Sequence, residues 1–226
     1  MFRFYYAPGT CALATHIALE EAGAPYEAVP VDFGSQAQRS PEYLAINPKG
    51  RVPALVTENG TLTETPGLLL FVAQRFPKTE LAPHSDPFAL AQVQEFNSYL
   101  CSTVHVAHAH GRRGARWADD AAAIEAMKRK VPATMTECFE LIERKLLKGP
   151  WVMGEQYTIC DRTCSRSGPG SKATGSTRPG CRASWSTANA CWRAQRCKKP
   201  WPLKGHKLPR NSCRLGARSL RGVETG

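Results

Sequence analysis

The first 80 residues alternate between short apolar stretches and stretches with helical periodicity. The expected elements are, in chain order, a strand at 1–6, a helix at 11–22, a strand at 26–31, a short helix at 39–46, strands at 52–56 and 62–63, and a helix at 67–75. Asn59-Gly60 favours a tight hairpin between the last two strands, and Pro66 suits a first helical turn. This β-α-β-α-β-β-α order predicts a compact α/β domain over residues 1–80.

The pattern becomes purely helical after a proline-containing linker at 76–86. Long helical runs are expected at 87–110 and 119–147. Thr158 and Asp161 have the spacing of a capping box, which predicts the start of another helix. We therefore expect an all-helical domain over residues 87–161.

Residues 162–226 do not continue this pattern. The net charge of +11 is unevenly distributed: residues 1–161 hold 15 Lys/Arg against 18 Asp/Glu, and residues 162–226 hold 15 against 1. The second segment has no Ile, Phe, Met or Tyr, so burial cannot offset the entropy of ordering it. We expect a disordered basic tail and an incomplete helical domain.

Composition narrows the classes of protein further. No apolar run approaches the roughly 18–20 residues of a membrane span, and the N-terminus lacks the features of a signal peptide. We expect a cytoplasmic protein with reduced thiols and no membrane partner. His105, His108 and His110 do not share one helix face, so no metal site is expected.

Cys11 is the best chemical candidate that the pattern provides. It follows a strand and a tight turn at the first turn of the expected helix, where free N–H groups and the helix dipole stabilise a thiolate. The alternative is a small buried apolar residue. Position alone leaves both interpretations open.

Four motifs extend this interpretation, and they lie in order across residues 1–161. They are YYAPGTCALATHIALEEAG, YLAINPKGRVPAL, LTETPGLLLFVAQ and GEQYTICD. Together they resemble the bacterial glutathione S-transferases, particularly the beta class. The resemblance implies a thioredoxin-like N-terminal domain, an all-helical second domain, a homodimer in the cytoplasm, and glutathione as co-substrate.

The resemblance also implies roles for individual residues. Cys11 would contact the glutathione sulfur or form a mixed disulfide with it, flanked by Tyr6, Thr10 and His105; Tyr6 could instead belong to the core alone. Glutathione would be bound by Val52, by Pro53 in a cis peptide, and by Glu64 and Thr65. Two departures from the family pattern are a missing lysine at 36–39 and Ser98 in place of an asparagine.

The tail has a second explanation, a reading frame lost at or just after Asp161. Read in the other frame with free wobble bases, ACWRAQRCKKPWP at 190–202 spells R-M-L-A-R-P-A-V-Q-K-A-L-A, which resembles the last helix of the family. The alternative is a genuine basic tail, whose mix of aromatic and cationic residues would suit binding to RNA or to a membrane.

Three functions follow from these observations. The first is a glutathione transferase that conjugates small electrophiles, with thiol–disulfide exchange through Cys11 as a second activity. The next is a non-catalytic binding or regulatory protein on the same fold, or an inactive frame-shifted product. The last is a nucleic-acid-binding protein, which we do not favour because a shifted frame produces the same composition.

Overall fold

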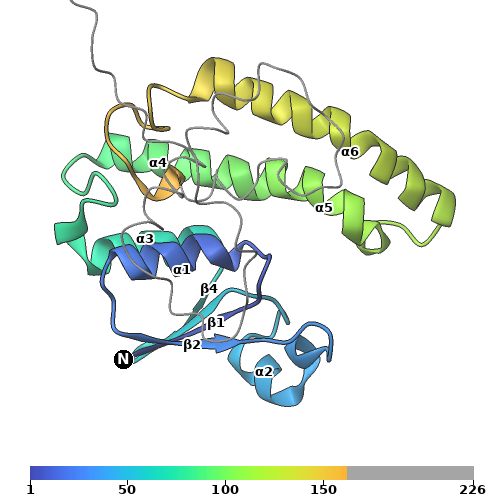
Figure 1. Ribbon diagram of the computed structural model, residues 1–226, viewed down its shortest axis with the longest axis horizontal. Helices are drawn as coiled ribbons and strands as arrows, with labels where there is room; N and C mark the ends of the chain where they lie inside the picture. Colours follow the sequence, from blue (N-terminus) through green and yellow to red (C-terminus); the bar gives the residue numbers. More distant parts are fainter. Residues whose placement is uncertain (162–226) are drawn as a thin grey trace, which may run out of the picture.

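The computed structural model describes residues 1–161. The expectations for residues 162–226, a disordered tail and a lost reading frame, lie outside the described residues. Figure 1 shows a lower α/β part and an upper layer of long helices. None of the described helices is long and apolar enough to cross a bilayer.

The α/β part has the predicted element order. Its elements are β1 (Phe2–Tyr6), α1 (Ala12–Glu21), β2 (Tyr26–Pro30), the 3₁₀ turn η1 (Ala37–Arg39), α2 (Pro41–Ile46), β3 (Ala54–Thr57), β4 (Gly60–Thr63), α3 (Thr65–Arg75) and the 3₁₀ turn η2 (Pro77–Thr79). The strands form one sheet in the order β2-β1-β3-β4. β1 pairs parallel with β2 and antiparallel with β3. This mixed sheet is the thioredoxin-like arrangement that was expected.

Side chains of β1 explain why helices cover both faces of the sheet. Phe2 packs against Phe71 of α3, with ring centroids 5.8 Å apart, and Phe4 packs against His16 of α1 at 5.3 Å. Tyr5 points the other way and packs against Tyr43 of α2 at 5.8 Å. Because successive side chains of a strand alternate between faces, α1 and α3 lie together on one face (Figure 1) and α2 lies on the other.

The first strand of the expected hairpin, β3, begins later than predicted. We expected residues 52–56, but β3 starts at Ala54, directly after Pro53, which has no N–H to donate to a neighbouring strand. The hairpin turn itself lies at the predicted Asn-Gly pair, since Thr57 pairs with Gly60. The cis isomer predicted for Pro53 is present.

The upper layer consists of long helices that change their winding partway. Its elements are α4 (Pro87–Tyr99), the π-helical turn η3 (Leu100–Val104), α5 (His105–Arg113), the 3₁₀ turn η4 (Gly114–Arg116), α6 (Ala121–Leu141) and the π-helical turn η5 (Ile142–Leu146). Asp86 caps α4 by accepting from the Phe88 and Ala89 amides. α5 and α6 lie side by side (Figure 1). The two predicted helical runs are thus present, each with a π-helical turn.

The predicted capping box is also present. Asp161 Oδ2 accepts from the Thr158 amide at 2.9 Å, and Thr158 Oγ1 accepts from the Cys160 amide at 3.3 Å. Asp161 Oδ1 also accepts from the Val152 amide at 2.8 Å. Burial raises the pKa of the Asp161 carboxyl, and the hydrogen bonds that it accepts from the Val152 and Thr158 amides oppose that effect. The new helical turn starts where the sequence predicted.

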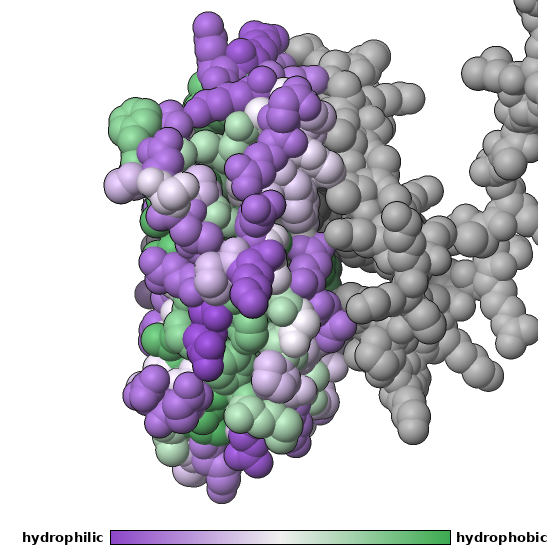
Figure 2. All heavy atoms as spheres, turned by 90° about the vertical axis from the view of Figure 1, so that its left-hand side faces the viewer, coloured by the Kyte–Doolittle hydropathy of each residue, from purple (hydrophilic) through white to green (hydrophobic). Residues whose placement is uncertain are grey.

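One apolar core runs through both parts. Its fully buried members include Phe4, Leu19, Leu68, Val93 and Ile159. The face in Figure 2 is largely hydrophilic, with smaller apolar areas between the polar side chains. The most exposed large apolar side chains after Met1 include Phe88 on α4, at 73% exposed.

Candidate functional site

The turn between β1 and α1 places Cys11 at the start of a helix. Thr10 Oγ1 donates to the Ala7 carbonyl at 2.7 Å and accepts from the Ala12 amide at 3.3 Å, which closes the turn. Cys11 is the N-cap of the ten-residue α1, and its thiol is partly exposed. Because the Thr10 proton is donated to Ala7, this side chain holds the turn and does not donate toward the sulfur.

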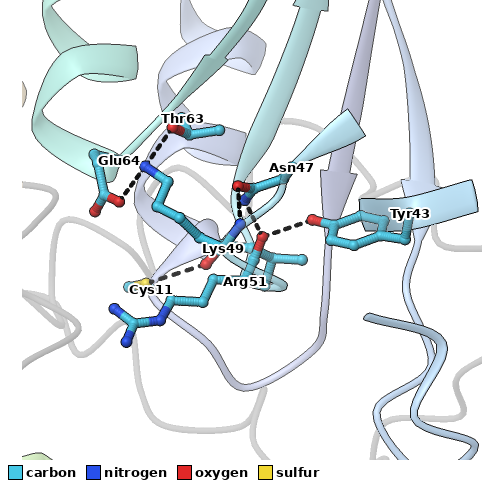
Figure 3. Close-up of polar contacts among 8 residues, drawn as sticks. Cys11, Tyr43, Asn47, Lys49, Arg51, Thr63 and Glu64 are labelled. Carbon is cyan, nitrogen blue, oxygen red and sulfur yellow. Dashed lines mark hydrogen bonds and ion pairs between the residues drawn. The ribbon is translucent and has the colours of Figure 1, made fainter. Parts of the chain in front are cut away.

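The Cys11 sulfur faces the loop that contains the cis peptide. Cys11 Sγ lies 3.9 Å from the Val52 carbonyl oxygen (Figure 3). The preceding carbonyl, that of Arg51, accepts from Tyr43 Oη at 2.7 Å and from Asn47 Nδ2 at 2.6 Å. These two donors fix the loop that holds Val52 beside the thiol.

Both donors to the Arg51 carbonyl are well suited to this role. Asn47 is 1% exposed, and its side-chain oxygen accepts from the Lys49 amide at 3.2 Å. Burial raises the pKa of Tyr43 to about 12, so the phenol keeps its proton at neutral pH and donates it. Sequence reasoning did not single out either residue.

Glu64 and Thr65 form the second part of the site, where β4 meets α3. Glu64 has φ 69°, a backbone conformation that non-glycine residues rarely adopt. Its carboxylate pairs with Lys49 Nζ at 2.6 Å, and the same ammonium donates to Thr63 Oγ1 at 2.7 Å (Figure 3). Thr65 is buried and is the first residue of α3. Such strain in a non-glycine residue is typical of a functional position.

Tyr6 lies at the end of β1 within a group of aromatic side chains. Its ring stacks with Phe4 at 6.0 Å and packs against His16 at 5.1 Å. Within residues 1–161 no hydrogen bond from the Tyr6 hydroxyl to the Cys11 turn is present. This packing supports the alternative that Tyr6 is a core residue, and its role beside the sulfur stays a prediction.

His105 begins α5 and contributes a neutral imidazole. Burial lowers its pKa, and four neighbouring cationic groups lower it further: Arg113, His108, Arg116 and Arg51. An uncharged ring is therefore favoured at neutral pH. The role of His105 toward the sulfur stays a prediction, since its described neighbours are cations.

Cys101 lies in the helical layer, one turn before His105, and its pKa is affected by the charge of Cys11. Burial raises the pKa of the Cys101 thiol to about 11, and the charges of Cys11 and Glu64 add to the effect. Cys101 lies in η3, a π-helical turn, and such turns often occur at functional sites. Sequence reasoning did not identify Cys101, because a charge interaction between residues far apart in the chain depends on the tertiary structure.

The histidine-rich stretch of α5 does not gather into a metal site within residues 1–161. His110 instead packs against Trp117, with ring centroids 4.3 Å apart. His108 is one of the groups whose positive charge lowers the pKa of His105.

The structure brings most of the predicted residues together at one end of the sheet. Cys11, Val52 and Pro53 are adjacent, and Glu64 with Thr65 lies on the same side, joined to them through Lys49 (Figure 3). The residues that sequence reasoning missed are Tyr43, Asn47, Lys49, Arg51 and Cys101. Lys49 was visible in the NPKG turn, but only the pairing of β3 with β4 places Thr63 and Glu64 beside it.

The α/β part is a thioredoxin-like domain with a cysteine beside a cis-proline loop, and a layer of helices follows it. This combination is typical of thioredoxin-like enzymes that act on thiols, and comparison with known proteins identifies the family. The family model described as "Glutathione S-transferase, N-terminal domain" matches residues 2–74. Among curated relatives, Glutathione S-transferase GstA of Escherichia coli O157:H7 is 29% identical over 161 residues, which cover 70% of this chain and 77% of that protein.

Solved structures extend the similarity. A glutathione transferase homolog from Sulfitobacter with bound glutathione is 40% identical, with a TM-score of 0.76 over 86% of this chain and 98% of that one. The beta class glutathione S-transferase of Sphingomonas chungbukensis is 26% identical, with a TM-score of 0.69 over 85% and 98%. The chain belongs to the glutathione S-transferase family, which is a family of enzymes.

Proposed function

We propose that this protein conjugates the thiolate of glutathione to small electrophiles, and that Cys11 also supports thiol–disulfide exchange. The observation that carries the proposal is the meeting of Cys11, the Val52–Pro53 loop and the Glu64–Thr65 helix start at one end of the sheet. The Sulfitobacter relative, which is 40% identical, has bound glutathione.

The groups present fit the parts of glutathione. The γ-glutamyl end carries an ammonium and a carboxylate. Glu64 supplies an anion, while Lys49 and the start of the eleven-residue α3 supply a cation and free N–H groups. The Val52 N–H makes no hydrogen bond within residues 1–161, so its backbone is available to the cysteinyl part as an added strand would be.

The chemistry follows from where the sulfur would lie. With its cysteinyl part on Val52, glutathione presents its sulfur near Cys11 and the start of α1, where a thiolate is stabilised by free N–H groups and the helix dipole. The thiolate forms a bond to an electrophilic carbon, and the leaving group departs with its electron pair. In exchange, the Cys11 thiolate attacks a glutathione disulfide and releases the other thiol.

Two measurements on the full chain test the proposal. Retention on immobilised glutathione, with elution by free glutathione, is expected from the site. Steady-state conjugation of 1-chloro-2,4-dinitrobenzene separates a transferase from a non-catalytic binding protein on the same fold. Absence of both retention and turnover in a folded sample would contradict the proposal.

We also propose a homodimer in the cytoplasm. The family resemblance motivates the dimer, and the exposed Phe88 on α4 offers apolar surface for an interface. No disulfide joins any of the four cysteines of residues 1–161, which fits a reducing compartment. Light scattering that shows only monomer at micromolar concentration would argue against the dimer.

We further propose that the reading frame was lost at or just after Asp161. The motivation is the sequence pattern of residues 162–226, and the match to the Escherichia coli relative leaves about a quarter of that protein without a counterpart. Resequencing of the nucleotides around the Asp161 codon tests this directly. A single-base repair should give a chain that ends near His206, binds glutathione and unfolds at higher temperature; an unambiguous in-frame read would refute the idea.

A further inference from the structure

The ion pair between Lys49 and Glu64 is built differently from the other ion pairs of residues 1–161. Those pairs join residues within strands or helical elements: Arg3 with Glu27, Glu125 with Lys128, and Glu140 with Arg144. Lys49 lies in the turn after α2, and Glu64 lies between β4 and α3 at a φ of 69°. The loop backbone therefore sets where both charges of this pair lie.

Lys49 is held at two points besides its contact with Glu64. Its amide donates to Asn47 Oδ1 at 3.2 Å, and its ammonium donates to Thr63 Oγ1 at 2.7 Å as well as to Glu64 Oε1 at 2.6 Å (Figure 3). Thr63 is the last residue of β4, so its position does not depend on what Glu64 binds. The Lys49 ammonium can therefore release the Glu64 carboxylate and still be held in place.

The Glu64 carboxylate, for its part, does not serve the helix that follows it. Glu64 is the N-cap of α3, yet its side chain makes no capping hydrogen bond and points to Lys49 instead (Figure 3). Pro66 has no N–H, and the amides of Thr65 and Gly67 make no hydrogen bond within residues 1–161. The start of α3 thus offers free donors beside a carboxylate and an ammonium that are paired with each other.

Opening this ion pair requires little free energy. The side chains of Lys49 and Glu64 are 45% and 63% exposed, and exposed ion pairs stabilise a fold only weakly because water competes for both charges. A ligand that brings a group of opposite charge to each residue can replace the pair and leave neither charge without a partner. A ligand with one charge cannot do so, because it pairs with one residue and deprives the other of its counter-ion.

We propose that Lys49 is a specificity-determining residue, which exchanges its contact with Glu64 for the α-carboxylate of the γ-glutamyl group while the α-ammonium binds Glu64. This rests on the binding of glutathione proposed above. The γ-glutamyl group carries both charges on one carbon atom, so they are adjacent, as the charges of Lys49 and Glu64 are. The site therefore selects thiols that have a free α-amino acid end and rejects those with only one of the two charges.

Three ligands that differ only at this end test the proposal in the full chain. S-methylglutathione carries both charges. S-methyl-4-aminobutyryl-cysteinylglycine lacks the α-carboxylate, and S-methyl-glutaryl-cysteinylglycine lacks the α-ammonium. The methyl group prevents a disulfide with Cys11, so NMR titration measures binding alone. The wild type should bind S-methylglutathione roughly tenfold more tightly than either analogue, since each analogue has lost a charge-assisted contact.

Variants of the two residues should change the affinities in opposite directions. Lys49→Met should weaken S-methylglutathione roughly tenfold but strengthen the 4-aminobutyryl ligand severalfold, because Glu64 then has no internal counter-ion. Glu64→Gln should strengthen the glutaryl ligand and weaken the 4-aminobutyryl ligand. Lys49→Arg keeps the charge and should retain the wild-type order of affinities.

Lys128→Met is the matched control, because Lys128 is 58% exposed and pairs with Glu125 on α6. It should leave all three affinities unchanged. Equal weakening of all three ligands in Lys49→Met would mean that Lys49 only supports the turn, and this would overturn the proposal. Unchanged affinity for S-methylglutathione in that variant would also overturn it, since the α3 amides alone would then bind the α-carboxylate.

Steady-state kinetics give an independent measurement. With 1-chloro-2,4-dinitrobenzene as electrophile, Lys49→Met should raise KM for glutathione roughly tenfold and change kcat less than about twofold, as for loss of a contact that is equal in the ground state and the transition state. A lower kcat at unchanged KM would overturn the assignment to binding.

The wild type distinguishes this proposal from the function on which it rests. Binding of S-methylglutathione with no preference over the two analogues contradicts the exchange at Lys49 and leaves the transferase function in place. A folded wild-type protein that binds none of the three ligands contradicts both.

Discussion

The α/β part and the helical layer differ in how their polar groups are partnered. In the α/β part, nearly every polar group beside Cys11 has a partner: Thr10 binds Ala7, and the Arg51 carbonyl accepts from Asn47 and Tyr43. In the helical layer, Arg113 and Arg116 have no carboxylate partner within residues 1–161. Hydrogen bonds thus fix the backbone beside Cys11 in the α/β part, whereas cations without carboxylate partners among the described residues occur in the helical layer and, as Arg39 and Arg51, in the α/β part.

This difference suggests a division of roles. A hydrogen-bonded loop can hold a backbone in the position that one fixed co-substrate needs. Unpaired charges act over a longer distance and with less demand on geometry, so they select among substrates by charge. Changes in the α/β part should therefore affect binding of glutathione or stability, and changes in the helical layer should affect the choice of electrophile.

The largest effect is expected from Cys11→Ala. The variant should lose all formation of a mixed disulfide with glutathione disulfide, because the attacking sulfur is absent. Intact-protein mass spectrometry measures the adduct. Cys138→Ala, which removes a buried thiol, is the control and should keep it. Adduct on the Cys11→Ala protein at the wild-type rate would show that another thiol reacts.

Asn47→Ala should cost about 1–3 kcal/mol of unfolding free energy, since it removes a buried donor to the Arg51 carbonyl and an acceptor for the Lys49 amide. Tyr43→Phe should cost only about 0.5–1.5 kcal/mol, because a single hydrogen bond is lost. Urea unfolding of both variants gives the comparison. A larger loss in Tyr43→Phe would mean that the phenol, and not the amide, holds the loop.

Glu64→Gly separates stability from binding in the same part. Glycine adopts a φ of 69° without strain, so the unfolding free energy should stay within about 1 kcal/mol of the wild type despite loss of an exposed ion pair. Affinity for glutathione should fall roughly tenfold with the carboxylate gone. Isothermal titration measures it, and Glu58→Gly, at the exposed hairpin turn, is the control. Unchanged affinity would remove Glu64 from the site.

The smallest effect should appear in the helical layer. Arg113→Gln removes a positive charge near His105, so the protonated imidazole becomes less unfavourable and the pKa of His105 should rise toward its ordinary value. NMR titration of the imidazole measures this, with Arg112→Gln as the control. An unchanged or lower pKa would show that the charge of Arg113 does not act on His105.

Local sequence determined much of this protein. The strand–turn–helix that presents Cys11, the Asn-Gly hairpin, the cis-proline position and the capping box at Thr158 all depend on residues within a few positions of one another. For such features the φ preferences of Gly and Pro, the free N–H groups of a helix start and the spacing of apolar residues suffice. Their boundaries shifted by a residue or two, as at β3, where neighbouring contacts decide the ends.

Contacts between distant residues were decided by the tertiary structure. Lys49 reaches Glu64 only because β3 and β4 pair in one register, and the charges of Cys11 and Cys101 interact although the two residues are far apart in the sequence. The charges that lower the pKa of His105 come from α5, from η4 and from Arg51 before β3, and no single element predicts their combined effect. Electrostatic energy depends on distances across the fold, whereas local pattern reports only which face of an element is apolar.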